Sequence, residues 1–184
     1  MAIVDALVAV DRAIGGWVQA NAGPGITAFM AGVSGLHGPR SIVAATFAIA
    51  LVLLWRRRFL DAATVLVTVL GGATLNHLVK HSVQRARPDT PIDWTGTTDY
   101  SFPSGHVANS TLLYGVAAAL LLARVTDLGW RIAIVACAVL AVTTVAASRL
   151  VLGAHHASDV LAGALLGMGW LALCLAVVRR AATS

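Results

Sequence analysis

The sequence predicts an all-α integral membrane protein, and three observations lead to that prediction. Of the 184 residues, 58% are hydrophobic and only 11% are charged, whereas a soluble domain carries about 25% charged residues. Several apolar stretches reach the roughly 20 residues that cross a bilayer as a helix. The connections between them are short, so residues 1–184 are expected to form a single domain without a linker.

The N-terminal segment is expected to lie at the membrane surface. Residues 1–20 are apolar enough to suggest a span, but charges such as Asp5 and Asp11 interrupt them. A charge at the centre of a span costs about 2.5–3.5 kcal/mol on insertion scales. We therefore interpret this stretch as an amphipathic interfacial helix, with a sixth span as the alternative. Gly23-Pro24-Gly25 predicts a break, and a second short helix is expected over about 26–36.

The remaining spans are expected to form a helical bundle over residues 39–178, with residues 1–38 as its interfacial part. Four stretches are clearly long and apolar enough to cross, and a fifth is short but can be extended backward. These stretches cover about 60–80, 105–123, 132–148 and 157–178, with the fifth at about 41–55. The sequence thus predicts five spans, or six if residues 1–20 cross. Glycines on the last stretch favour close helix contact: Gly163, Gly167 and Gly169.

Loop charges predict the orientation of the bundle. In a five-span arrangement seven arginines fall on one side, which has only two aspartates. The arginines are Arg56, Arg57, Arg58, Arg124, Arg131, Arg179 and Arg180. The positive-inside rule makes that side cytoplasmic. The net charge of +5 is then a topology signal, and the small separated basic clusters argue against a nucleic-acid partner.

Three polar segments lie at the opposite, extracytoplasmic ends of the predicted spans. The first reads Lys80-x6-Arg87-Pro88, the second Pro103-Ser104-Gly105-His106, and the third Ser148-Arg149-x5-His155-x3-Asp159. Together they supply three cations, two histidines and a carboxylate. Such a set can bind a phosphate group, attack it and protonate its leaving group.

The first segment ends one predicted span. Lys80 and Arg87 are seven residues apart, so they share a face if the helix continues that far. Taken singly, a snorkelling lysine and a solvated arginine would explain them. The connection over 81–104 is the longest polar stretch and is expected to be irregular and surface-exposed, with residues 89–100 and the N-terminal helix shaping access to the site.

The second segment begins the next predicted span. Ser104 immediately precedes an apolar run, so its hydroxyl is expected to cap a free backbone N–H. A helix start also binds anions through its unpaired N–H groups and its dipole. Gly105 lets the backbone approach such an anion closely, and His106 is expected to project into the same place.

The third segment carries the candidate nucleophile. His155 and Asp159 are four residues apart, which places them on one face of a helix. We expect the carboxylate to accept a hydrogen bond from one imidazole nitrogen, which leaves the other free to attack. Arg149 supplies a planar guanidinium that can hold two phosphate oxygens. The adjacent His156 competes as nucleophile, but its spacing to Asp159 is less favourable.

These three segments resemble the type 2 phosphatidic acid phosphatase (PAP2) superfamily, which also contains the vanadium haloperoxidases. The family pattern is KxxxxxxRP, PSGH and SRxxxxxHxxxD, and every specified position is met. The matching residues are Lys80, Arg87, Pro88, Pro103, Ser104, Gly105, His106, Ser148, Arg149, His155 and Asp159. The chain is most similar to small bacterial membrane phosphatases that act on polyprenyl pyrophosphates and phosphatidylglycerol phosphate. Such members usually have six spans, so an outside N-terminus, a span over 1–20 and a longer natural chain all stay open.

The resemblance implies a phosphatase mechanism without a metal or other cofactor. His155 would attack phosphorus to give a phosphohistidine, with Asp159 orienting it. His106 would protonate the leaving oxygen and then activate the hydrolytic water. The phosphate-binding residues would be Lys80, Arg87, Ser104, Gly105 and Arg149.

The resemblance also implies a phosphorylated lipid as substrate, in a bacterial cytoplasmic membrane whose outer face carries the site. Undecaprenyl pyrophosphate, phosphatidylglycerol phosphate, diacylglycerol pyrophosphate and phosphatidic acid all offer a terminal phosphate on a lipid. Two other functions stay open: a phosphotransferase of the same superfamily, and a non-catalytic protein that binds or transports anionic lipid. The oligomeric state stays open too.

Overall fold

The chain is helical throughout most of its length. The computed structural model describes residues 2–89 and 99–181, so part of the predicted polar connection, residues 90–98, lies outside the described residues. The helices are α1 (Ala2–Asn21), α2 (Pro24–Leu36), α3 (Pro39–Trp55), α4 (Phe59–Leu66), the π-helical turn η1 (Val67–Gly71), α5 (Gly72–Val83), α6 (Gly105–Leu122), α7 (Leu128–Val151) and α8 (Ala157–Ala181).

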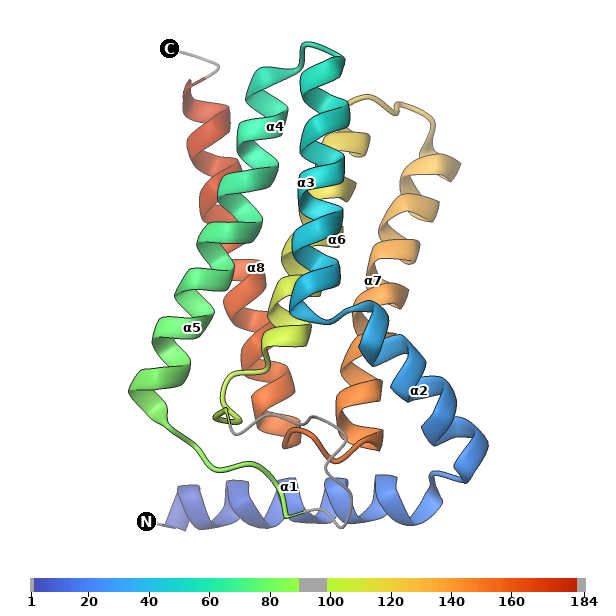
Figure 1. The fold of residues 1–184 in the computed structure, drawn as a ribbon, viewed down its shortest axis with the longest axis vertical. Helices are drawn as coiled ribbons and strands as arrows, with labels where there is room; N and C mark the ends of the chain where they lie inside the picture. The colour runs from blue at the N-terminus through green and yellow to red at the C-terminus, as the bar shows by residue number, and fades with distance from the viewer. Residues whose placement is uncertain (1, 90–98, 182–184) are drawn as a thin grey trace.

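The long helices form a bundle, and α1 lies crosswise at one end of it (Figure 1). Four helical segments within the described residues are long and apolar enough to cross a membrane: Phe59–Val83, Gly105–Leu122, Leu128–Val151 and Ala157–Ala181. A fifth span is reached if α2 and α3, bent by 48° at their junction, count as one. The predicted all-α membrane bundle is confirmed. Helix α3 is long enough for a fifth span only if it is extended backward past residue 39, as the sequence suggested.

The two N-terminal helices differ in how well they match the prediction. The crosswise placement of α1 agrees with a surface helix, and α1 is not among the described helices that could span. Helix α2 begins at Pro24, two residues earlier than predicted. Proline is a break in the middle of a helix but is well tolerated in its first turn, where its missing N–H would have no partner.

A π-helical turn divides the span Phe59–Val83 into α4 and α5. The indole of Trp170 on α8 donates a hydrogen bond of 3.0 Å to the carbonyl of Thr68 within this turn. A Cβ atom on Gly71 would lie 2.8 Å from the Trp170 ring, so the glycine makes room for the indole. This contact joins α8 to the middle of the span that ends in Lys80.

Glycines on α8 also set its distance from α6. A Cβ on Gly163 would lie 2.6 Å from the carbonyl oxygen of Ser104, and one on Gly167 would lie 2.9 Å from Cβ of Thr111. The predicted close contact is therefore confirmed at these two positions. It is wrong at Gly169, where a Cβ would meet nothing within 4 Å. The start of α6 is thus positioned by direct backbone packing against α8.

Candidate active site

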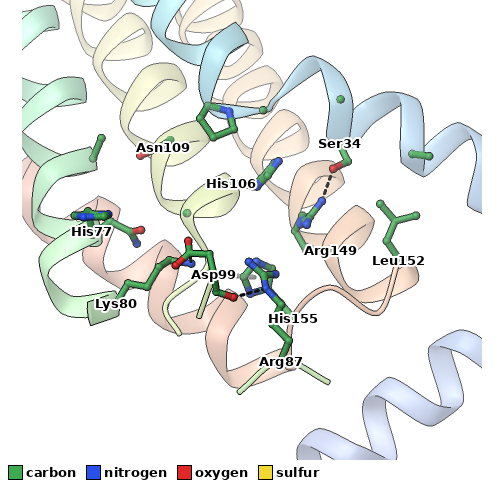
Figure 2. Close-up of a pocket in the computed structure, with 17 residues that line it drawn as sticks. Ser34, His77, Lys80, Arg87, Asp99, His106, Asn109, Arg149, Leu152 and His155 are labelled. Carbon is green, nitrogen blue, oxygen red and sulfur yellow. Dashed lines mark hydrogen bonds and ion pairs between the residues drawn. The ribbon is translucent and has the colours of Figure 1, made fainter. Parts of the chain in front are cut away.

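A cavity of about 520 Å³ opens at the end of the bundle near α1 (Figure 2). Its walls come from α2, α5, α6, α7, the segment after α5 and the turn before α8. Six of the eight predicted site residues line it: Lys80, Arg87, Gly105, His106, Arg149 and His155. The other two, Ser104 and Asp159, are fully buried behind its wall. Segments far apart in the sequence therefore meet at one place.

Lys80 reaches the cavity from the last turn of α5. Its ammonium donates a 2.6 Å hydrogen bond to the carbonyl of Tyr100 and lies 3.2 Å from a carboxylate oxygen of Asp99. Burial acts to raise the pKa of Asp99, but Lys80 and the backbone N–H of Tyr100 outweigh it, so this pKa lies below its ordinary value. Asp99 was not singled out from the sequence, so this ion pair was not predicted.

Arg87 reaches the same cavity from the segment that follows α5. Helix α5 ends at Val83, and Gln84 adopts a left-handed conformation with φ of 52°. The condition for a shared helix face of Lys80 and Arg87 is therefore not met, because the chain turns out of the helix before Arg87. Instead, Arg87 donates hydrogen bonds of 2.7 Å to the carbonyl of Asp99 and 2.8 Å to the carbonyl of Ala154. These bonds tie both loops at the cavity mouth together.

Arg149 lies in the last turn of α7 and is only 4% exposed. One terminal nitrogen donates to the hydroxyl of Ser34 on α2 (Figure 2). Its Nε has no hydrogen-bond partner in the described part of the chain. A buried guanidinium with an unpaired N–H is suited to an anion that brings its own oxygens.

His155 precedes α8 instead of lying on it, because α8 begins at Ala157. Its Nδ1 lies 3.8 Å from a carboxylate oxygen of Asp159, which is longer than a hydrogen bond. The predicted pairing on one helix face is thus wrong in its geometry, although the two groups are neighbours. Burial, with help from Arg149 and Arg87, lowers the pKa of His155 to about 4, while Asp159 opposes this shift. The imidazole is therefore neutral at neutral pH.

The carboxylate of Asp159 holds the turn that carries His155. It accepts hydrogen bonds from the Ser101 hydroxyl, from the backbone N–H of His156 at 2.9 Å and from Arg85 at 2.7 Å. These bonds fix the start of α8 against the segments before α6. His156, the competing nucleophile, contributes its backbone to this arrangement and is not among the residues lining the cavity.

The start of α6 forms the wall beside the histidines. Ser104 occupies the N-cap position, but its side chain makes no capping hydrogen bond, so that prediction is wrong. Its backbone N–H already donates to the carbonyl of Asp159 at 3.0 Å, and its buried hydroxyl has no partner among the residues described. Gly105 and His106 follow in the first turn and face the cavity.

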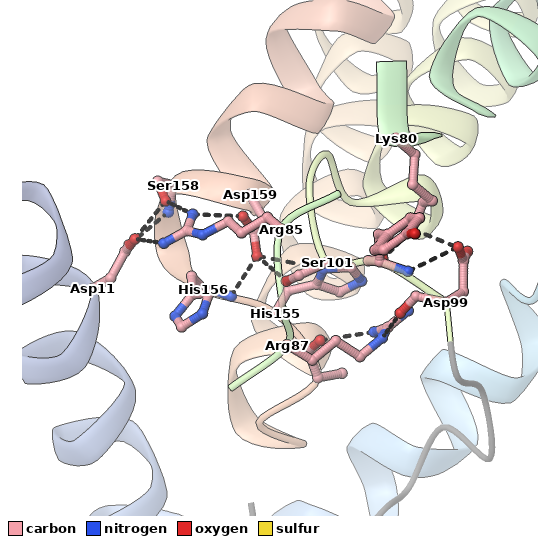
Figure 3. Close-up of polar contacts among 12 residues, drawn as sticks. Asp11, Lys80, Arg85, Arg87, Asp99, Ser101, His155, His156, Ser158 and Asp159 are labelled. Atoms are coloured by element: carbon pink, nitrogen blue, oxygen red, sulfur yellow. Dashed lines mark hydrogen bonds and ion pairs between the residues drawn. The ribbon is translucent and has the colours of Figure 1, made fainter. Parts of the chain in front are cut away.

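A second polar cluster supports the site from behind and was missed by sequence reasoning (Figure 3). Arg85 donates hydrogen bonds to Asp159, to Ser158 at 2.6 Å and to Asp11 at 2.8 Å. Asp11 also accepts from the backbone N–H and hydroxyl of Ser158 at 2.9 and 2.5 Å. The only signal in the sequence was that Asp11 is one of the charges that interrupt the apolar stretch 1–20, which indicated a surface helix but not the partner of Asp11.

The Asp11 carboxylate is 2% exposed. Burial acts to raise its pKa, but the bonds from Ser158 and Arg85 outweigh burial and hold the pKa below its ordinary value. Asp11 is therefore an anion that docks α1 onto the start of α8. In residues 2–89 and 99–181, no three acidic, histidine or cysteine side chains are grouped so that they could hold a metal ion.

Comparisons with known proteins agree with this geometry. The family model for the PAP2 superfamily matches residues 61–182. Lipid A 1-phosphatase of Rhizobium etli is 35% identical over 126 residues, which cover 63% of this chain and 49% of the relative. Decaprenylphosphoryl-5-phosphoribose phosphatase of Mycobacterium tuberculosis is 38% identical over 93 residues, covering 49% of this chain and 46% of that protein. The chain thus spans about half the length of these relatives.

Solved structures share the whole fold. The transmembrane PAP2-type phosphatidylglycerolphosphate phosphatase of Bacillus subtilis superposes with a TM-score of 0.86 at 25% identity, covering 95% of this chain and 87% of that one. Aquifex aeolicus LpxE superposes with a TM-score of 0.69 at 19% identity, covering 91% and 93%, and shows the fold alone. The family model and the shared helical bundle lead to one conclusion: the chain belongs to the PAP2 superfamily.

Proposed function

We propose that this protein is a membrane lipid phosphatase that removes a terminal phosphate through a phosphohistidine intermediate. The observation that carries the proposal is that Lys80, Arg87 and Arg149 line one cavity together with His106 and His155. Three cations match the charge of a phosphate, and an imidazole on each of two different elements matches the needs of attack and proton transfer. The relatives named above are lipid phosphatases, which supports a lipid carrier for the phosphate.

The first step transfers the phosphoryl group to the enzyme. The neutral imidazole of His155 attacks phosphorus, so an N–P bond forms while the bond from phosphorus to the lipid oxygen breaks. His106 gives a proton to that leaving oxygen. Asp159 lies 3.8 Å from the ring of His155 and offsets the positive charge that develops on it.

The second step releases inorganic phosphate. His106, now neutral, accepts a proton from a water molecule, and the water oxygen attacks the phosphohistidine. The N–P bond breaks, and His155 returns to its neutral form. Throughout both steps the three cations hold the phosphate oxygens, since phosphoryl transfer depends mainly on positioning and charge stabilisation. We propose that these cations replace a metal ion, with the hydroxyl of Ser104 and the backbone at Gly105 as further ligands.

The site is proposed to face outward from a bacterial cytoplasmic membrane. The loops that join α3 to α4 and α6 to α7, and the end of α8, lie at the bundle end opposite α1 (Figure 1). These segments and the first turn of α7 carry the seven arginines counted from the sequence. The positive-inside rule then makes their end cytoplasmic, and the cavity opens at the other end.

The proposed activity is tested by phosphate release from lipid phosphates by the detergent-purified protein in the presence of EDTA. We expect release by the wild type and a loss of at least about 1,000-fold in kcat for His155→Ala, because the nucleophile is removed. His156→Ala is the matched control and should retain most of the activity. Release that needs an added metal ion, or that survives in His155→Ala, would contradict the proposal.

A further inference from the structure

Two amide side chains face the cavity about one helical turn deeper in the bundle than the phosphate-binding groups. Asn76 precedes Lys80 by four residues on α5, and Asn109 follows His106 by three residues on α6. At about 1.5 Å per residue, Asn109 lies about 4.5 Å beyond His106 and Asn76 about 6 Å beyond Lys80 along their helices. Figure 2 shows Asn109 beyond His106, on the side away from His155.

Each amide presents a polar atom without a partner. Asn76 is 4% exposed, and its buried Nδ2 has no hydrogen-bond partner in residues 2–89 or 99–181. The same holds for the buried Oδ1 of Asn109. Buried polar groups are nearly always hydrogen-bonded. Two such orphan atoms on facing helices of one cavity therefore indicate a ligand that supplies the missing partners.

The chemistry of this deeper part differs from that of the cavity mouth. The cations that line the cavity within the described residues are Lys80, Arg87 and Arg149, and each lies at a helix end or in a loop. The amides add an uncharged donor and an uncharged acceptor. A hydroxyl group both donates and accepts, so it can satisfy an amide N–H and an amide carbonyl together. An ionised phosphate only accepts.

The proposed reaction decides which part of the substrate reaches the amides. Attack by His155 in line with the breaking bond places the leaving oxygen on the far side of phosphorus, where His106 protonates it. The carbon atoms attached to that oxygen then continue past His106 towards Asn109 and Asn76. These side chains consequently contact the lipid head group next to the breaking bond.

We propose that Asn76 and Asn109 form a subsite for a hydroxyl group on the leaving alcohol. This inference rests on the proposed phosphatase function and narrows its substrate class. The substrate is then a phosphate monoester of a hydroxylated head group, such as a glycerol or a sugar, on a lipid. A lipid pyrophosphate fits less well, because its inner phosphate would lie beside neutral amides about one turn below the cations.

The test compares two lipid phosphates that differ by one group. The probes are phosphatidylglycerol phosphate, whose terminal glycerol carries a free hydroxyl beside the scissile ester, and the matched lipid in which that hydroxyl is replaced by hydrogen. We expect the wild type to prefer the hydroxylated lipid in kcat/KM by about tenfold or more. Asn109→Ala should lose about tenfold on the hydroxylated lipid and less than about threefold on the deoxy lipid.

Two further variants complete the design. Asn76→Ala should show the same selective loss. Asn76 also packs near Gly105, so its replacement can in addition shift the start of α6. Ser110→Ala is the matched control. Ser110 is a buried neighbour of Asn109 with an unpartnered hydroxyl that is not among the residues lining the cavity, and its removal should leave the preference unchanged. Turnover of the deoxy lipid reports that each variant is folded.

The outcomes separate this inference from the function on which it rests. A preference for the hydroxylated lipid that disappears in Asn109→Ala and persists in Ser110→Ala supports the subsite. Hydrolysis of both lipids without discrimination by the wild type, or an equal loss on both lipids in Asn109→Ala, overturns the subsite and leaves the phosphatase proposal standing. Phosphate release from neither lipid, nor from a lipid pyrophosphate, overturns both.

Discussion

At the scale of single residues, burial sets the chemistry of the cavity. His155 is 4% exposed and is surrounded by positive side chains, so its imidazole stays neutral at neutral pH and keeps a free nitrogen lone pair. The identity of such residues could be predicted from the sequence because their types and spacings are distinctive. The contacts that these residues make could not be predicted in this way. The pairing of Lys80 with Asp99 depends on how the chain leaves α5, which spacing does not encode.

The lowered pKa of His155 predicts a pH profile. Protonation blocks the nucleophile, and the pKa falls from an ordinary 6.5 to about 4. Activity limited by His155 should therefore persist as pH drops below 6.5 and be lost as pH falls through about 4. The measurement is kcat/KM against pH, corrected for the second ionisation of the substrate phosphate, whose pKa is about 6. A corrected profile with its midpoint near 6.5 would show that His155 is not held in this environment.

At the scale of helices, small residues and buried charges decide where the site residues stand. Helix α8 approaches the start of α6 so closely that only a glycine fits at position 163. Close contacts were predicted for Gly163, Gly167 and Gly169, but the sequence did not show that Gly169 would make none, since that depends on the rotation of α8. In the same way, Asp11 was noticed as a charge in an apolar helix, while its partners Arg85 and Ser158 became visible only in the fold.

The contact at Gly163 predicts a sharp difference between two glycines of α8. Gly163→Ala would place a Cβ 2.6 Å from the carbonyl of Ser104 and push α6 away from α8. A displacement of about 1 Å near reacting groups can cost about 100-fold in rate, and we expect a fall of that order in kcat. Gly169→Ala meets nothing within 4 Å and should keep full activity. Similar kcat values for the two variants would refute the packing argument.

The buried carboxylate of Asp11 predicts that α1 supports catalysis from the membrane surface. Asp11→Asn removes the charge that holds Arg85 and the start of α8, so we expect kcat to fall about tenfold and amide hydrogen exchange in α1 to increase. Asp5→Asn, at an exposed position of the same helix, is the control and should change neither. Unaltered exchange in Asp11→Asn would show that the carboxylate does not dock the helix.

The docking of α1 should also depend on pH. Because the pKa of Asp11 in the folded protein lies below its ordinary value of 3.8, its contribution is complete above that pH. It is lost as pH falls below 3.8 and the carboxylate becomes protonated. Hydrogen exchange in α1 followed across this range in the wild type should therefore rise towards the level of Asp11→Asn.

At the scale of the whole molecule, the sequence predicted that the arginine clusters and the site residues lie at opposite ends of the bundle. Apolar stretches locate the spans, and the arginine clusters separate one end from the other. The N-terminal third was harder, because the bend of 48° between α2 and α3 makes the length of that span depend on tertiary packing. Residues of α2 such as Ser34 contribute to the cavity, and nothing in their local sequence marks them.

The orientation proposed for the bundle can be measured in intact cells. In a variant whose native thiols, Cys137 and Cys174, are replaced by serine, single cysteines are placed at exposed Gln84, near the cavity mouth, and at Arg57, in the loop after α3. A membrane-impermeant maleimide should label the first in intact cells and the second only after lysis. Labelling in the reverse order would place the cavity on the cytoplasmic side and contradict the charge argument.

Covalent phosphorylation of His155 is the step on which the proposed mechanism depends. The most direct test is to mix His106→Ala with p-nitrophenyl phosphate, whose leaving group departs without a proton from His106, quench in alkali, which preserves phosphohistidine, and locate the modification by peptide mass spectrometry. Because His106 is then missing only for the activation of water, the intermediate should accumulate, with phosphate on His155 and on no other residue. Phosphate on His156, or burst release of p-nitrophenol without any phosphorylated histidine, would contradict the mechanism.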